Sequence, residues 1–353
     1  MMKCIVPVAD PHQADPSSTP ELLQDLRAAV ADLKAVTPWP GFIRFTSLSG
    51  ATLGLAALSW HASHPSGFVL GAIATSISYA FWLICSHDAT HRSLTGWAWY
   101  DTLMPRLTSW PMLWPVGTYN QLHRLHHGWN GSNLRDPERL QWTEAEYQSA
   151  PTWQRWYVRH QWIIDIFILG GIGMISKTFV NGFRLRESAP HLPVQMSIDV
   201  AGMIGVQGAI LSVLYLQSIS LGKYLIFWLL LERGISAIVG TRDHLEHYGL
   251  WQQKSSYQIT QLYACRNVKA TRWVNWLMGG LPYHAVHHAF PQIPYYQLPE
   301  AFQRIQSVLR QHQLPPLVVA SGYIAASLEL SDRPSLIRPG ERDKRIDRTG
   351  RLS

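Results

Sequence analysis

A run of 43 residues, from Phe45 to His87, contains no Lys, Arg, Asp or Glu. A helix of about 20 apolar residues crosses a bilayer, so this run has room for two crossings and a short turn. The turn is predicted at 61–67, where His, Ser, Pro and Gly gather. We therefore expect two transmembrane helices, at about 42–60 and 67–86.

A second uncharged run begins at Val200 and, interrupted by Lys223, continues as an apolar stretch. It predicts a second hairpin, with transmembrane helices at about 197–217 and 221–240. Glu232 and Arg233 fall inside the last of these helices. Because charged groups are costly in lipid, we expect these two side chains to face protein, water or each other.

One further apolar segment, from Ile163 to Ile175, is shorter. Asp165 and Lys177 bracket only 11 uncharged residues, which are too few to span the hydrocarbon core. We expect a helix that lies in the membrane plane or is buried in protein.

The composition agrees with a membrane protein that has a large polar part. Charged residues make up 15% of the chain, against about 25% in soluble domains, yet the mean hydropathy is -0.05. With four spans, all but two of the 30 Lys and Arg residues lie on one side, the exceptions being Lys223 and Arg233. The positive-inside rule then puts this side and both termini in the cytoplasm. The net charge of +7 therefore reflects topology, and no nucleic-acid partner is expected.

Eight of the 16 histidines form three spaced clusters on the predicted cytoplasmic side. The clusters are His87 and His91; His123, His126 and His127; and His284, His287 and His288. On a helix, positions i, i+3 and i+4 share one face, so each cluster presents its imidazoles together. Imidazole suits Zn, Cu, Fe and Ni, and eight such ligands exceed what one ion needs. The clusters therefore predict a site for two metal ions close to the membrane.

In these clusters the chain resembles the integral-membrane fatty acid desaturase and hydroxylase superfamily. The similarity covers roughly residues 40–310 and rests on HDATH, HRLHH and HAVHH in this order, with two predicted spans between the second and the third. The stretch from Gly280 to Pro294 is also similar. The resemblance implies an all-α integral membrane protein, with four transmembrane helices in two hairpins and a cytoplasmic helical cap that holds a histidine-rich di-iron site.

The resemblance further implies two iron ions (Fe2+/Fe3+), which act with O2 and two externally supplied electrons. It also implies one more histidine ligand just after the fourth span. His247 is favoured, because its Glu-His-Tyr-Gly context is similar to that of the family, and His244 is the rival. Asp243 stands where the acyl-CoA branch of the family has an Asn that helps to hold a metal-bound water.

Two acidic residues adjoin predicted ligands in the sequence. Asp88 and Glu246 could orient imidazoles or balance their charge, and Asp243 is a third candidate for such a role. The alternative for each is a solvated surface acid.

The leading hypothesis is a membrane acyl-lipid desaturase, which inserts a double bond into the fatty-acyl chain of a membrane lipid. No electron-carrying domain is recognisable, so a separate donor, ferredoxin or a cytochrome b5-like protein, is expected. The alternatives with the same iron site are a carotenoid hydroxylase or ketolase, which Asp136-Pro137 also resembles, and an alkane hydroxylase, which the string Glu246–Leu250 resembles. A non-enzymatic metal-handling membrane protein is a further alternative.

Three parts are expected along the chain. Residues 1–41 form a polar segment and a peripheral amphipathic helix capped by Thr19. Residues 42–310 form the membrane desaturase domain. Residues 311–353 form a polar extension, whose tail from about 331 is expected to be disordered.

Overall fold

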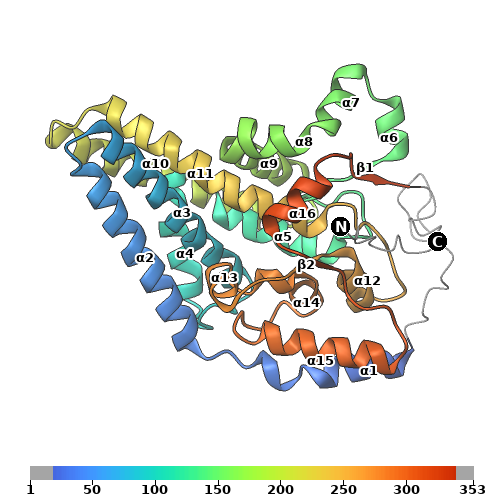
Figure 1. Cartoon of the computed structure of the whole chain (residues 1–353). Helices are drawn as coiled ribbons and strands as arrows, with labels where there is room; N and C mark the ends of the chain where they lie inside the picture. Colours follow the sequence, from blue (N-terminus) through green and yellow to red (C-terminus); the bar gives the residue numbers. More distant parts are fainter. Residues whose placement is uncertain (1–18, 339–353) are drawn as a thin grey trace, which may run out of the picture.

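The computed structural model describes residues 19–338. The predicted polar segment 1–18 and the end of the predicted tail, 339–353, lie outside the described residues. Four long helices extend to one side of the molecule, and shorter helices surround their other ends as a cap (Figure 1). The long helices are α2 (Pro38–Trp60), α3 (Pro65–Thr90), α10 (Leu192–Leu216) and α11 (Leu221–His247).

Helices α2 and α3 form the first predicted hairpin. Each has proline in its first turn, where the missing N–H would have no helical partner anyway. The Ser59 hydroxyl donates to the carbonyl of Phe68 at 2.7 Å, and Gly71 packs against the backbone of Ser59. The helices therefore approach closely at the turn. The last residues of α3 continue past 86 to Thr90 and carry His87 into the cap.

Helices α10 and α11 form the second predicted hairpin. Glu232 and Arg233, inside α11, pair with each other as expected. Arg233 also donates to the carbonyl oxygens of Ile168 and Leu169. The two charges are thus satisfied within the protein. The end of α11 continues past 240 to His247.

The third apolar segment is helical, and five helices among the described residues are long and apolar enough to cross a membrane. The fifth consists of α8 (Gln161–Ile163), the π-helical turn η3 (Ile164–Leu169) and α9 (Gly170–Arg184). Gly170 has φ 59° and ψ -144°, which interrupts the regular helix at that residue. At 1.5 Å per residue, the 15 residues of α9 extend over about 22 Å, which is less than the thickness of a hydrocarbon core.

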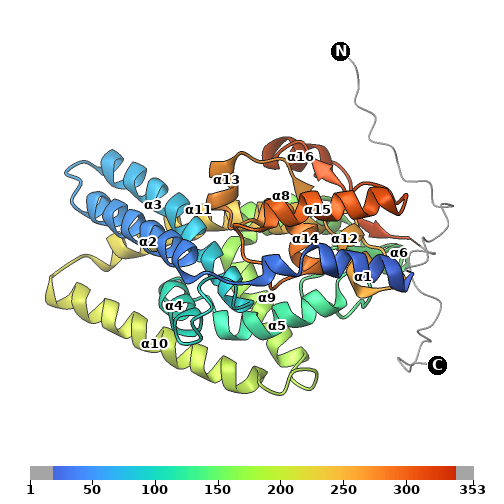
Figure 2. The same cartoon turned by 90° about the horizontal axis from the view of Figure 1, so that it is seen from below.

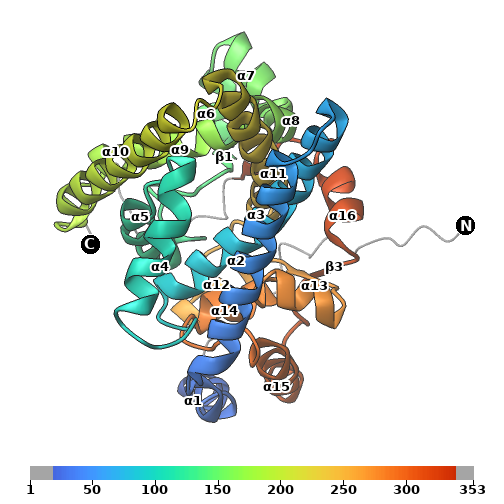
Figure 3. The ribbon, with the colours of Figure 1, turned by 90° about the vertical axis from the view of Figure 1, so that its left-hand side faces the viewer.

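The two ends of the described chain pack against each other. Helix α1 (Pro20–Ala29) is capped as predicted by Thr19, whose hydroxyl accepts the N–H of Leu22, and the 3-10 turn η1 (Asp32–Lys34) follows it. The predicted apolar face is buried in a cluster shared with α15 (Leu298–Gln311), and its residues are Leu22, Leu26, Val30 and Leu33. The two helices lie side by side at the bottom of Figure 3, and Figure 2 shows them on the cap side.

The other elements complete the cap, with one exception. They are α4 (Tyr100–Ser109), η2 (Trp110–Met112), α5 (Val116–Trp129), α6 (Glu144–Ser149), α7 (Thr152–Arg159), α12 (Tyr257–Ala264), α13 (Arg272–Leu277), η4 (Leu281–Tyr283), α14 (His284–Ala289) and α16 (Tyr323–Leu330). The exception is η2, which packs between α10 and α11, where the carbonyl of Pro111 accepts hydrogen bonds from Gln207 and Trp228. Two pairs of parallel two-residue strands connect distant segments: β1 (Trp142–Thr143) with β4 (Leu336–Ile337), and β2 (Asn267–Val268) with β3 (Val319–Ala320).

The expected disorder is wrong for residues 331–338. Tyr248 donates its hydroxyl to the carbonyl of Arg333, and Ser335 is buried. Strand β4 pairs with β1, and Ile337 is only 2% exposed. The polar composition of the tail misled the prediction, because composition does not report partners that a segment far away in the sequence supplies.

Candidate metal centre

The three histidine clusters meet inside the cap. Helix α3 carries His87, with His91 at its C-cap, while α5 carries the second cluster and α14 the third. Together with His247 at the end of α11, all eight cluster histidines lie in two adjoining groups.

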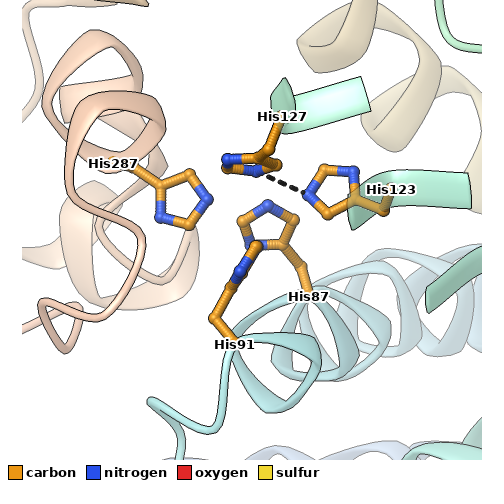
Figure 4. A group of neighbouring side chains, drawn as sticks. All are labelled: His87, His91, His123, His127 and His287. Atoms are coloured by element: carbon orange, nitrogen blue, oxygen red, sulfur yellow. Dashed lines mark hydrogen bonds between the residues drawn. The ribbon is translucent and has the colours of Figure 1, made fainter. Parts of the chain in front are cut away.

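The first, here called the five-histidine group, consists of His87, His91, His123, His127 and His287. One ring nitrogen of each lies within 4.8 Å of the others, and the five rings point toward one another (Figure 4). The ring centroids of His87 and His287 are 4.5 Å apart, and the Nε2 atoms of His127 and His123 are 3.0 Å apart. Three separate helices thus converge on one point.

The second group consists of His247, His284, His288 and Cys265. Nε2 of His247 lies 3.0 Å from Nε2 of His284 and 3.2 Å from Nε2 of His126, so His126 adjoins this group. Two nitrogens that bind one ion at about 2.1 Å and at right angles are about 3 Å apart. The rings of His127 and His288 stack with centroids 4.0 Å apart, which brings the two groups into contact.

Several ring nitrogens of these groups are buried without a hydrogen-bond partner among residues 19–338. They include Nε2 of His87, His91, His287 and His288. An unpaired buried polar atom costs about 1–3 kcal/mol. A neutral imidazole has one donor, so three mutually close Nε2 atoms cannot all be satisfied by one another. A metal cation would satisfy these nitrogens, so the donor set fits a metal.

Carboxylates contact the outer nitrogens of the second cluster. Asp136 Oδ1 lies 2.9 Å from Nδ1 of His126, and Glu138 Oε1 lies 2.8 Å from Nδ1 of His123. Such contacts fix the ring orientation and the tautomer, so that Nε2 faces the interior of the group.

The acids predicted from the sequence lie at different distances from the groups. Asp88 Oδ1 is 3.5 Å from Nδ1 of His87, and Glu246 Oε2 is 3.4 Å from Nδ1 of His284. Both carboxylates are buried and are not solvated surface acids. Asp243 lies 3.9 Å from Arg242, its nearest cation, and lines a neighbouring cavity.

The electrostatics of the groups favour metal binding. Burial, together with the neighbouring imidazoles, lowers the pKa of His287 and His288 well below its ordinary value. Both rings are therefore neutral at pH 7, as metal ligands must be. Burial acts in the same direction on His126, but Asp136 and Glu138 outweigh it and raise the pKa of His126 to about 9. The same two carboxylates would stabilise the charge of a metal ion at this ring, with which a proton competes.

The structure separates the two rival histidines of α11. His247 faces the second group, whereas Nδ1 of His244 lies 3.1 Å from the carbonyl oxygen of Gly240. Nε2 of His244 lies 3.3 Å from Oδ2 of Asp165. His244 therefore belongs to a polar contact between α11 and η3.

Sequence reasoning did not identify four neighbours of the groups: Asp136, Glu138, Gln261 and Cys265. Of these four, only Asp136 and Glu138 could have been suspected from the sequence, because they closely follow the histidine cluster of α5. Sγ of Cys265 lies 3.8 Å from Nδ1 of His247, on the ring edge opposite Nε2. Burial raises the pKa of this thiol. The Sγ atom also lies within 4.8 Å of the candidate ligand atoms of His247, His284 and His288.

A cavity of about 440 Å3 adjoins the five-histidine group at His87. One part of its lining is apolar and comes from α3, η3, α9 and α11: Leu83, Ile84, Leu169, Met174 and Val239. Another part is polar and comes from the cap, α8 and α9: Arg139, Gln141, Tyr157, Gln161 and Lys177. The cavity therefore fits a molecule with a hydrocarbon chain and a polar head.

Residues 58–318 match the sequence model of the family described as fatty acid desaturase. The chain is 22% identical over 293 residues to the sn-1 oleoyl-lipid 12-desaturase of Picosynechococcus sp., covering 81% of each chain. It is 24% identical over 254 residues to the omega-3 fatty acid desaturase, endoplasmic reticulum, of Vigna radiata, covering 67% of this chain and 64% of that relative. It is 23% identical over 253 residues to the sn-1 acyl-lipid omega-3 desaturase (ferredoxin) of Nostoc sp., covering 66% of each.

We predict that His247→Ala lowers the metal bound per chain, because it removes the nitrogen that approaches both His126 and His284. The matched variant His244→Ala removes an imidazole of the same helix that contacts Asp165 instead, and should keep the wild-type metal content. Elemental analysis of purified protein by mass spectrometry would measure both. Loss of metal in His244→Ala with retention in His247→Ala would reverse the assignment.

Proposed function

Since the chain belongs to the fatty acid desaturase family, whose members are oxidoreductases, we propose that it is an acyl-lipid desaturase. The reaction inserts a double bond into the fatty-acyl chain of a membrane lipid, with O2 and two electrons. The observation that carries this proposal is the contact between a cavity with apolar and polar walls and the five-histidine group at His87.

The proposed metals are two iron ions, held by the nine predicted histidines. These are His87, His91, His123, His127 and His287 for one ion, and His126, His247, His284 and His288 for the other. When bound, iron supplies the redox chemistry with O2 that attacks an unactivated methylene group, which zinc lacks. The protein holds the neutral imidazoles in place through Asp136, Glu138, Asp88 and Glu246.

The lining of the cavity favours a substrate with a polar head. A carotene or an alkane would put hydrocarbon against Lys177, which has no hydrogen-bond or ion-pair partner among residues 19–338, and burying an unpaired charge opposes such binding. Arg139 and Gln141 are paired with Glu146 and with the carbonyl of His247. An acyl lipid puts its ester and headgroup at the polar wall and its chain along Leu83 and Met174. The names of the relatives, which include acyl-lipid desaturases, agree with this substrate.

We predict that expression in a host that makes β-carotene but no polyunsaturated lipids yields a new acyl double bond. Mass spectrometry of acyl chains and pigments would detect it. The variant His126→Ala should abolish the product while the protein stays in the membrane. The control His160→Ala should keep the product, because His160 is the exposed C-cap residue of α7. An oxygenated carotenoid with unchanged acyl chains would favour a carotenoid hydroxylase or ketolase and contradict the proposal.

The proposed electron donor is a separate acidic carrier such as ferredoxin or a cytochrome b5-like protein. Of the five-histidine group, only His91 is not fully buried. Arg92 and Arg124 are exposed beside it, and neither forms a salt bridge within residues 19–338. One relative bears ferredoxin in its name. A basic surface at the most accessible imidazole suits a negatively charged donor.

We predict that Arg92→Glu/Arg124→Glu weakens turnover driven by ferredoxin about tenfold or more at low salt, because like charges then face each other. Reduction by dithionite, which needs no docking, should be unchanged. The pair Arg155 and Arg159 on α7, of which Arg155 is half-buried and Arg159 exposed, provides a control of equal charge change. Equal losses in both charge-reversed proteins would contradict a donor surface at His91.

The proposed topology has four spans, with the histidine site and both termini in the cytoplasm and residues 42–310 as the catalytic domain. Helices on one side of a membrane are separated by an even number of crossings. The packing of α1 against α15 supports four crossings between them, by α2, α3, α10 and α11. The interruption at Gly170 supports a non-spanning α8–α9 segment. The distribution of Lys and Arg supports the cytoplasmic orientation.

We predict that single cysteines Ser63→Cys and Gln217→Cys, in the two hairpin turns, react with a membrane-impermeant maleimide in intact bacterial cells. Glu187→Cys, in the cap, should react only after the cells are permeabilised. All three positions are polar and solvent-exposed, so reactivity reports the side of the membrane. A Glu187→Cys protein labelled in intact cells would refute this topology.

A further inference from the structure

Arg44 is a fully buried cation that the site described so far does not use. It lies in α2, a candidate membrane span, and its exposed fraction is 0%. A buried charge is strongly unfavourable unless it is paired and hydrogen-bonded. The surroundings of this guanidinium therefore indicate what it does.

Three groups from two distant segments accept hydrogen bonds from Arg44. Nη1 donates to Oδ2 of Asp88 at 2.9 Å. Nε donates to the carbonyl of Trp276 at 2.7 Å, and Nη2 donates to the carbonyl of Leu277 at 3.0 Å. The ring of Tyr295 lies over the guanidinium, with the ring centroid 5.2 Å from Cζ of Arg44. Through these contacts the Arg44 guanidinium connects α3, the end of α13 and the loop after α14.

Both held segments lead directly to predicted metal ligands. The other oxygen of Asp88, Oδ1, lies 3.5 Å from Nδ1 of His87, whose Nε2 faces the five-histidine group. The Trp276–Leu277 segment precedes η4 and α14, and α14 carries His287. The rings of His87 and His287 are 4.5 Å apart. Arg44 therefore contacts the supports of two ligands that must meet at one ion.

The packing around this ion pair leaves no spare room. Gly279 has φ +60°, and a Cβ there would lie 2.9 Å from Nη1 and Nη2 of Arg44 and from Oδ2 of Asp88. Only glycine fits both this backbone conformation and this space. The turn before α14 therefore packs closely against the Arg44–Asp88 ion pair.

We propose that Arg44 is a positioning residue of the metal centre: through Asp88 it orients His87, and through the carbonyls of Trp276 and Leu277 it sets the place of His287. The inference rests on the proposed function, in that the five-histidine group holds one of two iron ions. It adds a residue of the first membrane helix to the determinants of metal binding.

Arg233 provides a matched control. It also lies in a candidate span, pairs with a neighbouring carboxylate, Glu232, and donates to backbone carbonyls. Its partners belong to η3 and α11 and contact none of the nine predicted ligands. A loss of general stability should therefore appear in both arginine variants, whereas a change in metal retention should appear only at Arg44.

The test measures the release of Fe2+ from dithionite-reduced, full-length holoenzyme to a coloured chelator, next to the melting temperature. In Arg44→Met and in the isosteric variant Asp88→Asn, one of two irons should be released about 10- to 100-fold faster. Arg44→Lys, which keeps the charge but not the three-way hydrogen bonding, should be intermediate. The double variant should accelerate release by less than the product of the two single effects, because the contact between Arg44 and Asp88 is common to both, while Arg44 also acts through the carbonyls of Trp276 and Leu277. Arg233→Met should retain both irons as the wild type does.

Each other result overturns the inference. Unchanged release in Arg44→Met and Asp88→Asn, or equal acceleration for both irons in step with the melting temperature, leaves Arg44 a purely structural ion pair. If Arg44→Met does not fold, Arg44→Lys decides, because it keeps the buried charge but not the hydrogen bonds to Asp88, Trp276 and Leu277. If the wild-type protein contains two irons and the variants release them at the wild-type rate, only this inference is contradicted. If the wild-type protein contains no iron, the proposed function itself is contradicted.

Discussion

Nine imidazoles packed side by side, eight of them fully buried, are the constraint on which the rest of the structure depends. Each ring has two nitrogens, and among residues 19–338 four of the nine Nε2 atoms find no hydrogen-bond partner, while the other five lie within hydrogen-bond distance only of one another. Neutral rings cannot satisfy one another in groups of three or more, and each unpaired atom costs about 1–3 kcal/mol. A cation at the centre of each group removes that cost. The groups also connect α3, α5, α11 and α14, which are far apart in the sequence, so metal binding and cap assembly are coupled.

The membrane helices determine where in the molecule the histidine groups lie. Helices α3 and α11 continue beyond their apolar parts and bring His87 and His247 into the cap at a fixed height. The cavity between α3, α9 and α11 reaches the same level, with hydrocarbon-compatible walls toward the helices and polar walls toward the cap. Under the proposed function, an acyl chain in this cavity would lie beside the five-histidine group at His87. Chemistry at the membrane surface is thus a consequence of helices that are longer than the bilayer is thick.

Local sequence patterns predicted the elements that depend on local physics. The two uncharged runs predicted both hairpins, Thr19 was recognised as a cap, and Glu232 and Arg233 pair as expected. Patterns failed where a partner comes from far away. The tail residues 331–338 read as disordered, yet β1 and Tyr248 hold them. The length of an apolar segment did not reveal that Gly170 interrupts it.

The sequence by itself determined the three histidine clusters that gather in the cap, because helical periodicity puts i, i+3 and i+4 histidines on one face and the uncharged runs place them next to the long apolar helices. Only the tertiary structure decided how the nine histidines divide into two groups, that His247 and not His244 faces them, and that Asp136, Glu138 and Arg44 support them. The physical reason is the separation along the sequence between the residues that come into contact. A helix repeats every few residues, whereas His87 and His287, or Arg44 and Leu277, meet only after two hairpins and a cap have folded around them.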